Sequence, residues 1–361
     1  MIGIVHNGDL KYCPYLKKYE DILIENNIEY EVLFWNRSAI EYNNSNYIPF
    51  DKPSELKENK LLKVRDFYCF RKWLLRMIAK KKYDKLIILS TLSGILIQRR
   101  LVRHYSCNYI FDIRDYSYEK FYPFYLMEKR IIRHSAFTTI SSKGFCKFLP
   151  SDYPYVLTHN ISECDEKSDR NFIKKDVKMI NVVWLGMVRY FEQQTMVMKK
   201  LSQDGRFNLW YYGAGAELYK FKQFASENKL KNVHFFGPYD NTDKAILLGK
   251  ADIINNCYAV DIETKYALSN KFYDGIFYHI PQLVEPTTFK AELTERYNLG
   301  IALDPKQDSF ADKLYEYYIK IDEENFIRSC ENVKRMVLAE EEECLNKIKN
   351  FLSSKEEVLG T

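Results

Sequence analysis

Between Ser269 and Asp274 the sequence places a hydroxyl, an amide, an ammonium and a carboxylate at the expected start of a helix. A serine at the N-cap can accept a hydrogen bond from a first-turn amide, so Ser269 predicts where this helix begins. Asn270 and Lys271 then fall in the first turn, and Asp274 shares their helical face. Free amides and the helix dipole favour anions at such an end. The pattern therefore suits a nucleotide diphosphate, with the amides and Lys271 on the phosphates and Asp274 on the ribose.

A simpler interpretation of the same stretch is an exposed Lys271–Asp274 pair on an ordinary capped helix, since such helices are common. Pro281 ends the helix because it lacks an amide N–H and disfavours helix at the residue before it. Residues 282–284 then form the next expected strand. The residues alone leave both interpretations open.

Charged residues also follow two expected strands in the first half of the chain. Asp9 comes after the strand 2–6, and Arg114-Asp115 comes after the strand 108–113. Open α/β sheets bind ligands at the carboxyl ends of their strands. Asp115 could therefore act as a general base or orient an acceptor hydroxyl, with Arg114 beside it and Asp9 as the second candidate. An ordinary ion pair between Asp115 and Arg114 explains the same residues.

The elements that must position these residues alternate between strands and helices. This alternation predicts parallel sheets covered by helices. We therefore expect an α/β protein with two doubly wound, Rossmann-like domains that face a cleft. Residues 36–60 are polar and contain Pro49 and Pro53, so we expect a long loop there.

A length of 361 residues agrees with about two domains. We expect an acceptor-binding domain at 1–165 and a nucleotide-binding domain at 179–335. A charged segment that is poor in apolar residues predicts a linker at 166–178. A C-terminal helix, 336–361, could pack back on the first domain.

The composition limits the class of protein. The eight cysteines form no close pairs and no metal-ligand spacing, so we expect reduced thiols, no metal site and no cofactor. No apolar run approaches the roughly 18 residues that a membrane span needs. The first residues lack the pattern of a signal peptide, so we expect a cytoplasmic protein.

Residues 63–103 are strongly basic, with twelve Lys or Arg against two Asp. Phe67, Tyr68 and Trp73 are interleaved with these charges along an expected helix, 61–82. Such a helix suits an anionic membrane surface, so the chain could be peripheral on the inner face of the cell membrane. A solvated helix whose aromatic residues are in the core explains the pattern equally well. We do not expect nucleic acid as a partner, although it too favours basic aromatic patches.

In the second half, glycines mark the ends of successive expected strands. Gly186 is followed by Arg189, Gly213 ends the next strand, and Tyr239 follows a further glycine, Gly237. A glycine after a strand is often only a tight turn. Because the carboxyl ends of parallel strands meet at one edge, these residues and the helix after Ser269 could line one nucleotide pocket.

The order of these segments resembles the GT-B glycosyltransferases. The second half is similar to family 4 and to related bacterial capsule and lipopolysaccharide enzymes. The matching segments are VVWLGMVR (182–189), LWYYGAG (209–215), NVHFFGPY (232–239), AD (251–252) and SNKFYDGIFYHIPQLV (269–284). In the first half, DIRD (112–115) resembles an Arg-Asp motif of some of these enzymes.

The resemblance implies roles for single residues of the second half. It places Gly186 near the diphosphate, Arg189 on the phosphates, Asp274 on the ribose and Tyr239 near the base.

Four positions depart from the family pattern, and Ser269 and His279 are two of them, where the family usually has proline and glycine. The second phosphate-binding cation is replaced by Gln194, and the earlier of two family glutamates falls at Tyr266. Lys271 could supply the missing positive charge.

The resemblance implies metal-independent transfer of a sugar from a nucleotide diphosphate sugar, expected to be a UDP-sugar. The expected acceptor is a hydroxyl of a growing, lipid-linked surface polysaccharide. Two other classes stay open: an epimerase-like enzyme that acts on a nucleotide sugar without a glycan acceptor, and a non-catalytic binding partner in a capsule assembly complex.

Overall fold

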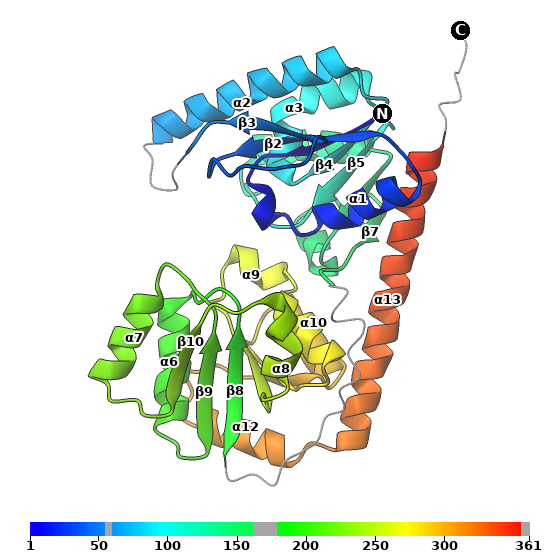
Figure 1. Ribbon diagram of the computed structural model, residues 1–361. Coiled ribbons are helices and arrows are strands. Elements are labelled where there is room, and N and C mark those ends of the chain that lie inside the picture. Colours follow the sequence, from blue (N-terminus) through cyan, green and yellow to red (C-terminus); the bar gives the residue numbers. More distant parts are fainter. Residues whose placement is uncertain (55–59, 162–178, 355–361) are drawn as a thin grey trace. The chain divides into compact units, whose positions relative to one another are not determined.

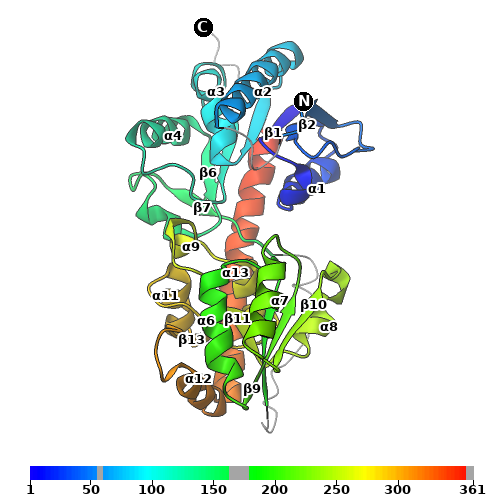
Figure 2. The same ribbon diagram turned by 90° about the vertical axis from the view of Figure 1, so that its left-hand side faces the viewer.

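The computed structural model describes residues 1–54, 60–161 and 179–354. The chain divides into two compact units: unit 1 is Met1–Thr158 with Glu340–Thr361, and unit 2 is His159–Ala339. Each unit contains one parallel β-sheet with helices packed on it (Figures 1 and 2), which confirms the predicted α/β fold with two Rossmann-like domains. The expected linker, 166–178, lies outside the described residues.

Unit 1 is built on a seven-stranded sheet with the order β3-β2-β1-β4-β5-β6-β7. The order changes direction between β1 and β4, and open α/β sheets bind ligands at the carboxyl edge beside such a point. The strands are β1 (Ile2–His6), β2 (Tyr30–Asn36), β3 (Tyr47–Asp51), β4 (Lys85–Leu89), β5 (Tyr109–Ile113), β6 (Phe137–Ile140) and β7 (Tyr155–Leu157).

The helices of unit 1 lie on two faces of this sheet. Right-handed connections place α2, α3 and α4 on one face and α1 on the other. The end of α13 also packs beside α1, where Cys344 and Ile348 join the core with Tyr19. The helices are α1 (Leu16–Glu25), α2 (Lys60–Lys81), α3 (Thr91–His104), α4 (Tyr122–His134) and α13 (Glu323–Ser353), with short 3-10 turns at Leu10–Tyr12 and Lys143–Lys147.

The structure corrects the expected loop at residues 36–60, because Tyr47–Asp51 forms strand β3. Pro49 pairs opposite Phe34 of β2. A proline is tolerated there because β3 lies at the edge of the sheet, where it needs hydrogen bonds on one side only. Phe50 packs edge-on against Trp35 with ring centroids 6.0 Å apart, which fixes the strand against the core.

Unit 2 is built on a six-stranded sheet with the order β10-β9-β8-β11-β12-β13. Its strands are β8 (Ile180–Leu185), β9 (Phe207–Tyr212), β10 (Val233–Gly237), β11 (Ile253–Asn256), β12 (Gln282–Val284) and β13 (Gly300–Ala302). Its helices are α6 (Phe191–Ser202), α7 (Leu218–Glu227), α8 (Lys244–Leu248), α9 (Ile262–Tyr266), α10 (Asn270–Phe277), α11 (Phe289–Arg296) and α12 (Phe310–Ile319), with a 3-10 turn at Asn241–Asp243. The beginning of α13 completes the core of this unit through Phe326, Cys330 and Val333.

Candidate functional site

The ends of β8, β9 and β10 meet through three glycines with positive φ: Gly186 (105°), Gly213 (143°) and Gly237 (82°). The Gly213 amide donates to the Gly237 carbonyl at 2.7 Å, and the Gly186 amide donates to the Tyr212 carbonyl at 2.9 Å. A Cβ on Gly213 would lie 1.8 Å from the Gly186 oxygen, so no other residue fits there. The three glycines therefore lie together at the carboxyl edge of the sheet, and at Gly186 and Gly237 a Cβ would meet nothing within 4 Å.

The loop after β8 brings Arg189 to this edge. The Val188 amide donates to the Ala214 carbonyl at 2.9 Å, which ties the loop to the end of β9. Arg189 is exposed, and its guanidinium lies 4.7 Å from the centre of the Tyr190 ring and 5.7 Å from that of Tyr258. Its charge is therefore held over aromatic faces while its donors remain accessible to an anion.

Helix α10 begins after Ser269, as predicted, but the predicted capping bond is absent. Ser269 occupies the N-cap with extended backbone, and its side chain makes no capping hydrogen bond. Its hydroxyl instead donates to Asn256 Oδ1 at 2.7 Å, at the end of β11. A capping serine would accept from the second or third amide of the helix, and the third, that of Phe272, donates to the Ser269 carbonyl at 2.9 Å. The amide of Lys271, the second residue, is thus left without a side-chain cap.

Lys271 lies inside the protein, so the alternative of an ordinary surface pair with Asp274 is wrong. The two residues are 4% and 3% exposed. The Lys271 ammonium donates to the Tyr258 hydroxyl at 2.9 Å and sits 3.7 Å from the centre of the Trp184 ring. Asp274 instead forms an ion pair with Lys244 at 2.5 Å.

Besides Lys244, three residues that the sequence did not single out complete this cluster: Tyr258, Glu285 and Lys290. Lys290 is 1% exposed, pairs with Glu285 at 3.1 Å and lies 4.3 Å from the centre of the Tyr258 ring. Glu285 also accepts the Tyr258 amide at 2.8 Å. Glu285 directly follows β12, and Tyr258 is the second residue after β11. Their positions after expected strands are the signal in the sequence that could have identified them.

The cluster contains more positive than negative buried charge. Lys244 pairs with Asp274, and Lys290 pairs with Glu285. The Lys271 ammonium instead donates to a neutral group, the hydroxyl of Tyr258. Burial lowers the pKa of Lys271 well below its ordinary value, and the neighbouring Lys290 lowers it further, against the opposing effect of Asp274. An anion bound beside Lys271 would relieve this cost.

Comparisons with known proteins give matches at the level of structure. No protein-family model and no curated protein sequence matches this chain. Sucrose-phosphate synthase from Thermosynechococcus elongatus has a similar structure, with a TM-score of 0.70, 12% sequence identity and 97% of each chain covered. HepE from Anabaena, solved in complex with UDP, gives a TM-score of 0.66 and 11% identity over 97% of this chain and 100% of HepE.

WaaG, a glycosyltransferase involved in lipopolysaccharide biosynthesis, gives a TM-score of 0.65 and 10% identity over 98% of this chain and 100% of WaaG. This chain has the GT-B glycosyltransferase fold. The resemblance that the sequence motifs indicated is therefore confirmed for the fold.

The position where the GT-B resemblance predicts a second phosphate-binding cation belongs to the core. Gln194 is fully buried, and its amide donates to the Cys257 carbonyl at 2.5 Å. Its side-chain oxygen accepts from Tyr211 at 3.0 Å and from Asn255 at 2.8 Å. Gln194 therefore joins α6 to β9 and β11, and its hydrogen bonds leave it no role toward a ligand.

Two aromatic residues occupy the remaining positions that the resemblance singles out. Tyr266, at the place of the earlier glutamate, ends α9 and lies 5.5 Å from the Lys265 ammonium. Tyr239, predicted near the base, follows β10 and is partly buried against the core of unit 2. The structure leaves the base contact of Tyr239 a prediction.

In unit 1, the carboxylate of Asp9 accepts hydrogen bonds from the neighbouring loop. Its Oδ1 accepts the amides of Arg37 at 2.7 Å and Ser38 at 3.0 Å, and its Oδ2 accepts the Ser38 hydroxyl at 2.7 Å. These bonds hold the loop that follows β2. Because its lone pairs are engaged in holding this loop, Asp9 suits a structural role better than that of a general base.

Arg114 and Asp115 are adjacent in sequence but differ in environment. Arg114 is buried and binds Asp112 through two nitrogens, at 2.8 and 2.9 Å. Asp112 also accepts the Tyr19 hydroxyl at 2.9 Å. Asp115 is exposed at the carboxyl end of β5, where an acceptor could reach it. Arg114 therefore stabilises unit 1, and Asp115 stays the candidate base.

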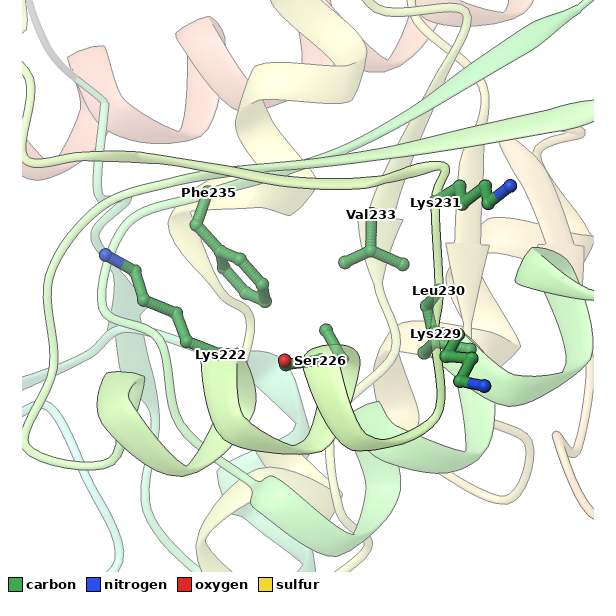
Figure 3. Close-up of a pocket in the computed structure, with 8 residues that line it drawn as sticks. Lys222, Ser226, Lys229, Leu230, Lys231, Val233 and Phe235 are labelled. Carbon is green, nitrogen blue, oxygen red and sulfur yellow. The ribbon is translucent and has the colours of Figure 1, made fainter.

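A surface pocket of unit 2 lies between α7 and the edge strand β10 (Figure 3). Its lining consists of Lys222, Ala225, Ser226, Lys229, Leu230, Lys231, Val233 and Phe235. None of the residues predicted for the nucleotide is among them. Within the described parts of the chain, no three His, Cys, Asp or Glu side chains are grouped as metal ligands would be.

Proposed function

We propose that this protein is a glycosyltransferase that uses a nucleotide diphosphate sugar, specifically a UDP-sugar, as its donor. The observation that carries this proposal is the buried Lys271 ammonium, held between Trp184 and Tyr258 beside the start of α10. Arg189 lies at the exposed side of the same aromatic group. HepE, a structural neighbour, binds UDP and UDP-glucose in its own crystals, which supports this choice of nucleotide.

The proposed reaction needs charge stabilisation at the diphosphate. The bond between the anomeric carbon and the diphosphate oxygen breaks, and the electron pair leaves with the diphosphate. Lys271, Arg189 and the free amides at the start of α10 would stabilise this charge without a bound metal. Gly186 and Gly213 would let the backbone approach the phosphates, and the base would lie near Tyr239. Asp274, which is buried and paired with Lys244, is not assigned a contact with the ribose.

On the acceptor side, a hydroxyl oxygen forms the new bond to the anomeric carbon. Its proton goes to a base, for which Asp115 is the exposed carboxylate at a strand end of unit 1. We propose that the acceptor is a hydroxyl of a growing, lipid-linked surface polysaccharide. The lipopolysaccharide role of WaaG is consistent with this acceptor class.

Purified protein incubated with UDP-sugars and lipid-linked glycan extracts is the direct test. We expect transfer of labelled sugar to the lipid fraction. Asp115→Asn should lower transfer by at least about 100-fold, as expected for loss of a general base, with UDP affinity by calorimetry unchanged. Transfer at the original rate in this variant would remove Asp115 from the mechanism.

The same assay separates the other two classes. A changed sugar in the absence of any acceptor would identify an epimerase-like enzyme. UDP-sugar binding with neither transfer nor hydrolysis would identify a non-catalytic binding partner.

A further inference from the structure

The outward side of α2 carries apolar side chains that packing does not explain. Leu61, Val64 and Tyr68 are 78%, 67% and 56% exposed. The opposite side of the helix packs into unit 1 through Phe70 and Leu74, both fully buried. The helix is therefore apolar on two sides, and the sheet accounts for only one of them.

The same outward side is cationic. Lys72, Arg76 and Lys80 are exposed and follow Tyr68 at helical spacing along the helix. Asp66 is the one acidic residue in the sequence of α2, and it is buried and paired with Lys52 at 2.5 Å. The exposed surface of α2 thus combines apolar and positive groups without a negative one.

The first turns of α2 lie at the carboxyl edge of the unit 1 sheet. Lys52, the ion-pair partner of Asp66, directly follows β3. Arg37, which follows β2, lies 5.3 Å from the centre of the Phe67 ring and donates its amide to Asp9. The exposed apolar turns of α2 are therefore on the edge that also holds the candidate acceptor residue Asp9.

A second group of exposed rings lies on the same edge, where β5 leads into α4. Tyr118, Phe121 and Tyr122 are 60%, 63% and 67% exposed. They follow Asp115 in the chain, and Tyr122 stacks on Tyr125 with centroids 6.5 Å apart. The helices α2 and α4 (Figure 2) cover the same face of the sheet, because right-handed connections lead from β3 to β4 and from β5 to β6.

We propose that this edge of unit 1 binds the surface of an anionic lipid bilayer. Leu61, Val64 and Tyr68 would enter the interface between headgroups and acyl chains, and the cations of α2 would contact lipid phosphates. No described helix is long and apolar enough to span a membrane, so the contact is with the surface. Membrane binding itself does not depend on the proposed function. Its expected benefit does, since binding would bring a lipid-linked acceptor to Asp115.

Sedimentation with vesicles tests the charges. The full chain is mixed with vesicles of phosphatidylcholine alone, or of phosphatidylcholine and phosphatidylglycerol in equal parts. We expect strong binding to the anionic vesicles only. The triple variant Lys72→Gln/Arg76→Gln/Lys80→Gln should lower the partition coefficient about 100-fold, since each cation near an anionic surface contributes about a factor of 5.

A matched control removes three exposed lysines from unit 2. Lys222→Gln/Lys229→Gln/Lys231→Gln causes the same change in net charge at the pocket of Figure 3 and should retain most of the binding. An equal loss in both variants would show that net charge acts without a specific surface, and would overturn the proposal.

The apolar residues have their own pair of variants. Leu61→Ser/Tyr68→Ser should lower binding about tenfold or more, because two side chains no longer enter the interface. Tyr219→Ser/Ile246→Ser removes two side chains of unit 2 that are 65% and 64% exposed, and should leave binding unchanged. All four substituted side chains are exposed, so folding is expected to survive.

Two outcomes would contradict the proposal that this edge binds an anionic bilayer. Equal binding to neutral and anionic vesicles would refute the role of the cations. No sedimentation with either vesicle would indicate that the exposed rings serve a protein partner. UDP affinity, measured on the same variants, should stay unchanged. A loss of vesicle binding can therefore be distinguished from a loss of donor binding.

Discussion

The buried charges of the two units are balanced in different ways. In unit 1, Arg114 pairs with Asp112 at 2.8 Å, and Lys18 pairs with Glu341 on the returning part of α13. In unit 2, two ion pairs surround Lys271, whose ammonium is hydrogen-bonded to a phenol.

We expect this difference to separate a structural cluster, around Arg114, from a ligand-binding cluster, around Lys271. A buried ion pair that is satisfied by its own partners has no charge left for a ligand. A buried ammonium between aromatic rings is costly until an anion reaches it, and perturbed groups of this kind gather at functional sites. We therefore expect the Arg114–Asp112 pair of unit 1 to serve stability and Lys271 of unit 2 to serve a ligand.

The largest expected effect is on the stability of unit 1. Arg114→Leu leaves the Asp112 carboxylate buried without its two-nitrogen partner, which should cost about 3–5 kcal/mol. Chemical denaturation measures this loss. As a control, Lys320→Ala breaks an exposed pair with Glu316 and should change stability by less than about 0.5 kcal/mol. Equal losses would mean that the unit 1 cluster is not what stabilises this edge.

Removal of the corresponding cation in unit 2 should affect binding and leave stability intact. Lys271→Met keeps an apolar stem between Trp184 and Tyr258 but removes the buried charge. Replacement of a buried charge by an apolar group is often neutral or stabilising. UDP affinity should fall by about 10- to 100-fold, because hydrogen bonds to charged groups contribute roughly 1.5–3 kcal/mol.

Calorimetry with UDP measures this effect, and Lys222→Met on exposed α7 is the control that should bind UDP normally. Unchanged UDP affinity in Lys271→Met would contradict a ligand role for this residue. A large loss of stability would instead make Lys271 a structural residue like Arg114.

A smaller effect follows from the lowered pKa of Lys271. A bound diphosphate raises this pKa again, so the complex holds more protons than the free protein in the pH range between the two values. UDP affinity should therefore weaken as pH rises through this range, by at most tenfold per pH unit. Asp274 and Glu285 oppose the lowering, and Lys290 and Arg189 add to it.

The pH slope is measured by calorimetry in buffers with different heats of ionisation, which also report proton uptake. In Lys271→Met the slope should flatten over the same range. A wild-type affinity without pH dependence there, or an unchanged slope in the variant, would show that Lys271 does not titrate on binding.

Most of the fold could be predicted because its signals are local. Apolar runs and strand-end glycines such as Gly186 and Gly213 mark strands and turns directly in the sequence. Strand β3 was missed because Pro49 argues against a strand, and only the position at a sheet edge removes that objection.

The candidate site could be predicted only in part, because its chemistry depends on burial. The sequence places Ser269 at the N-cap, but its hydroxyl bonds Asn256 from a strand that is distant in sequence. Nothing local indicates that Lys271 is buried or that Lys290 lies over the ring of Tyr258. Such contacts arise when the ends of β11 and β12 are brought together with α10.

A crystal structure of the protein with UDP tests the central claim most directly. We predict that the diphosphate lies at the start of α10, with phosphate oxygens within hydrogen-bond distance of Lys271 and Arg189. A diphosphate bound elsewhere, with Lys271 still donating only to Tyr258, would contradict the account.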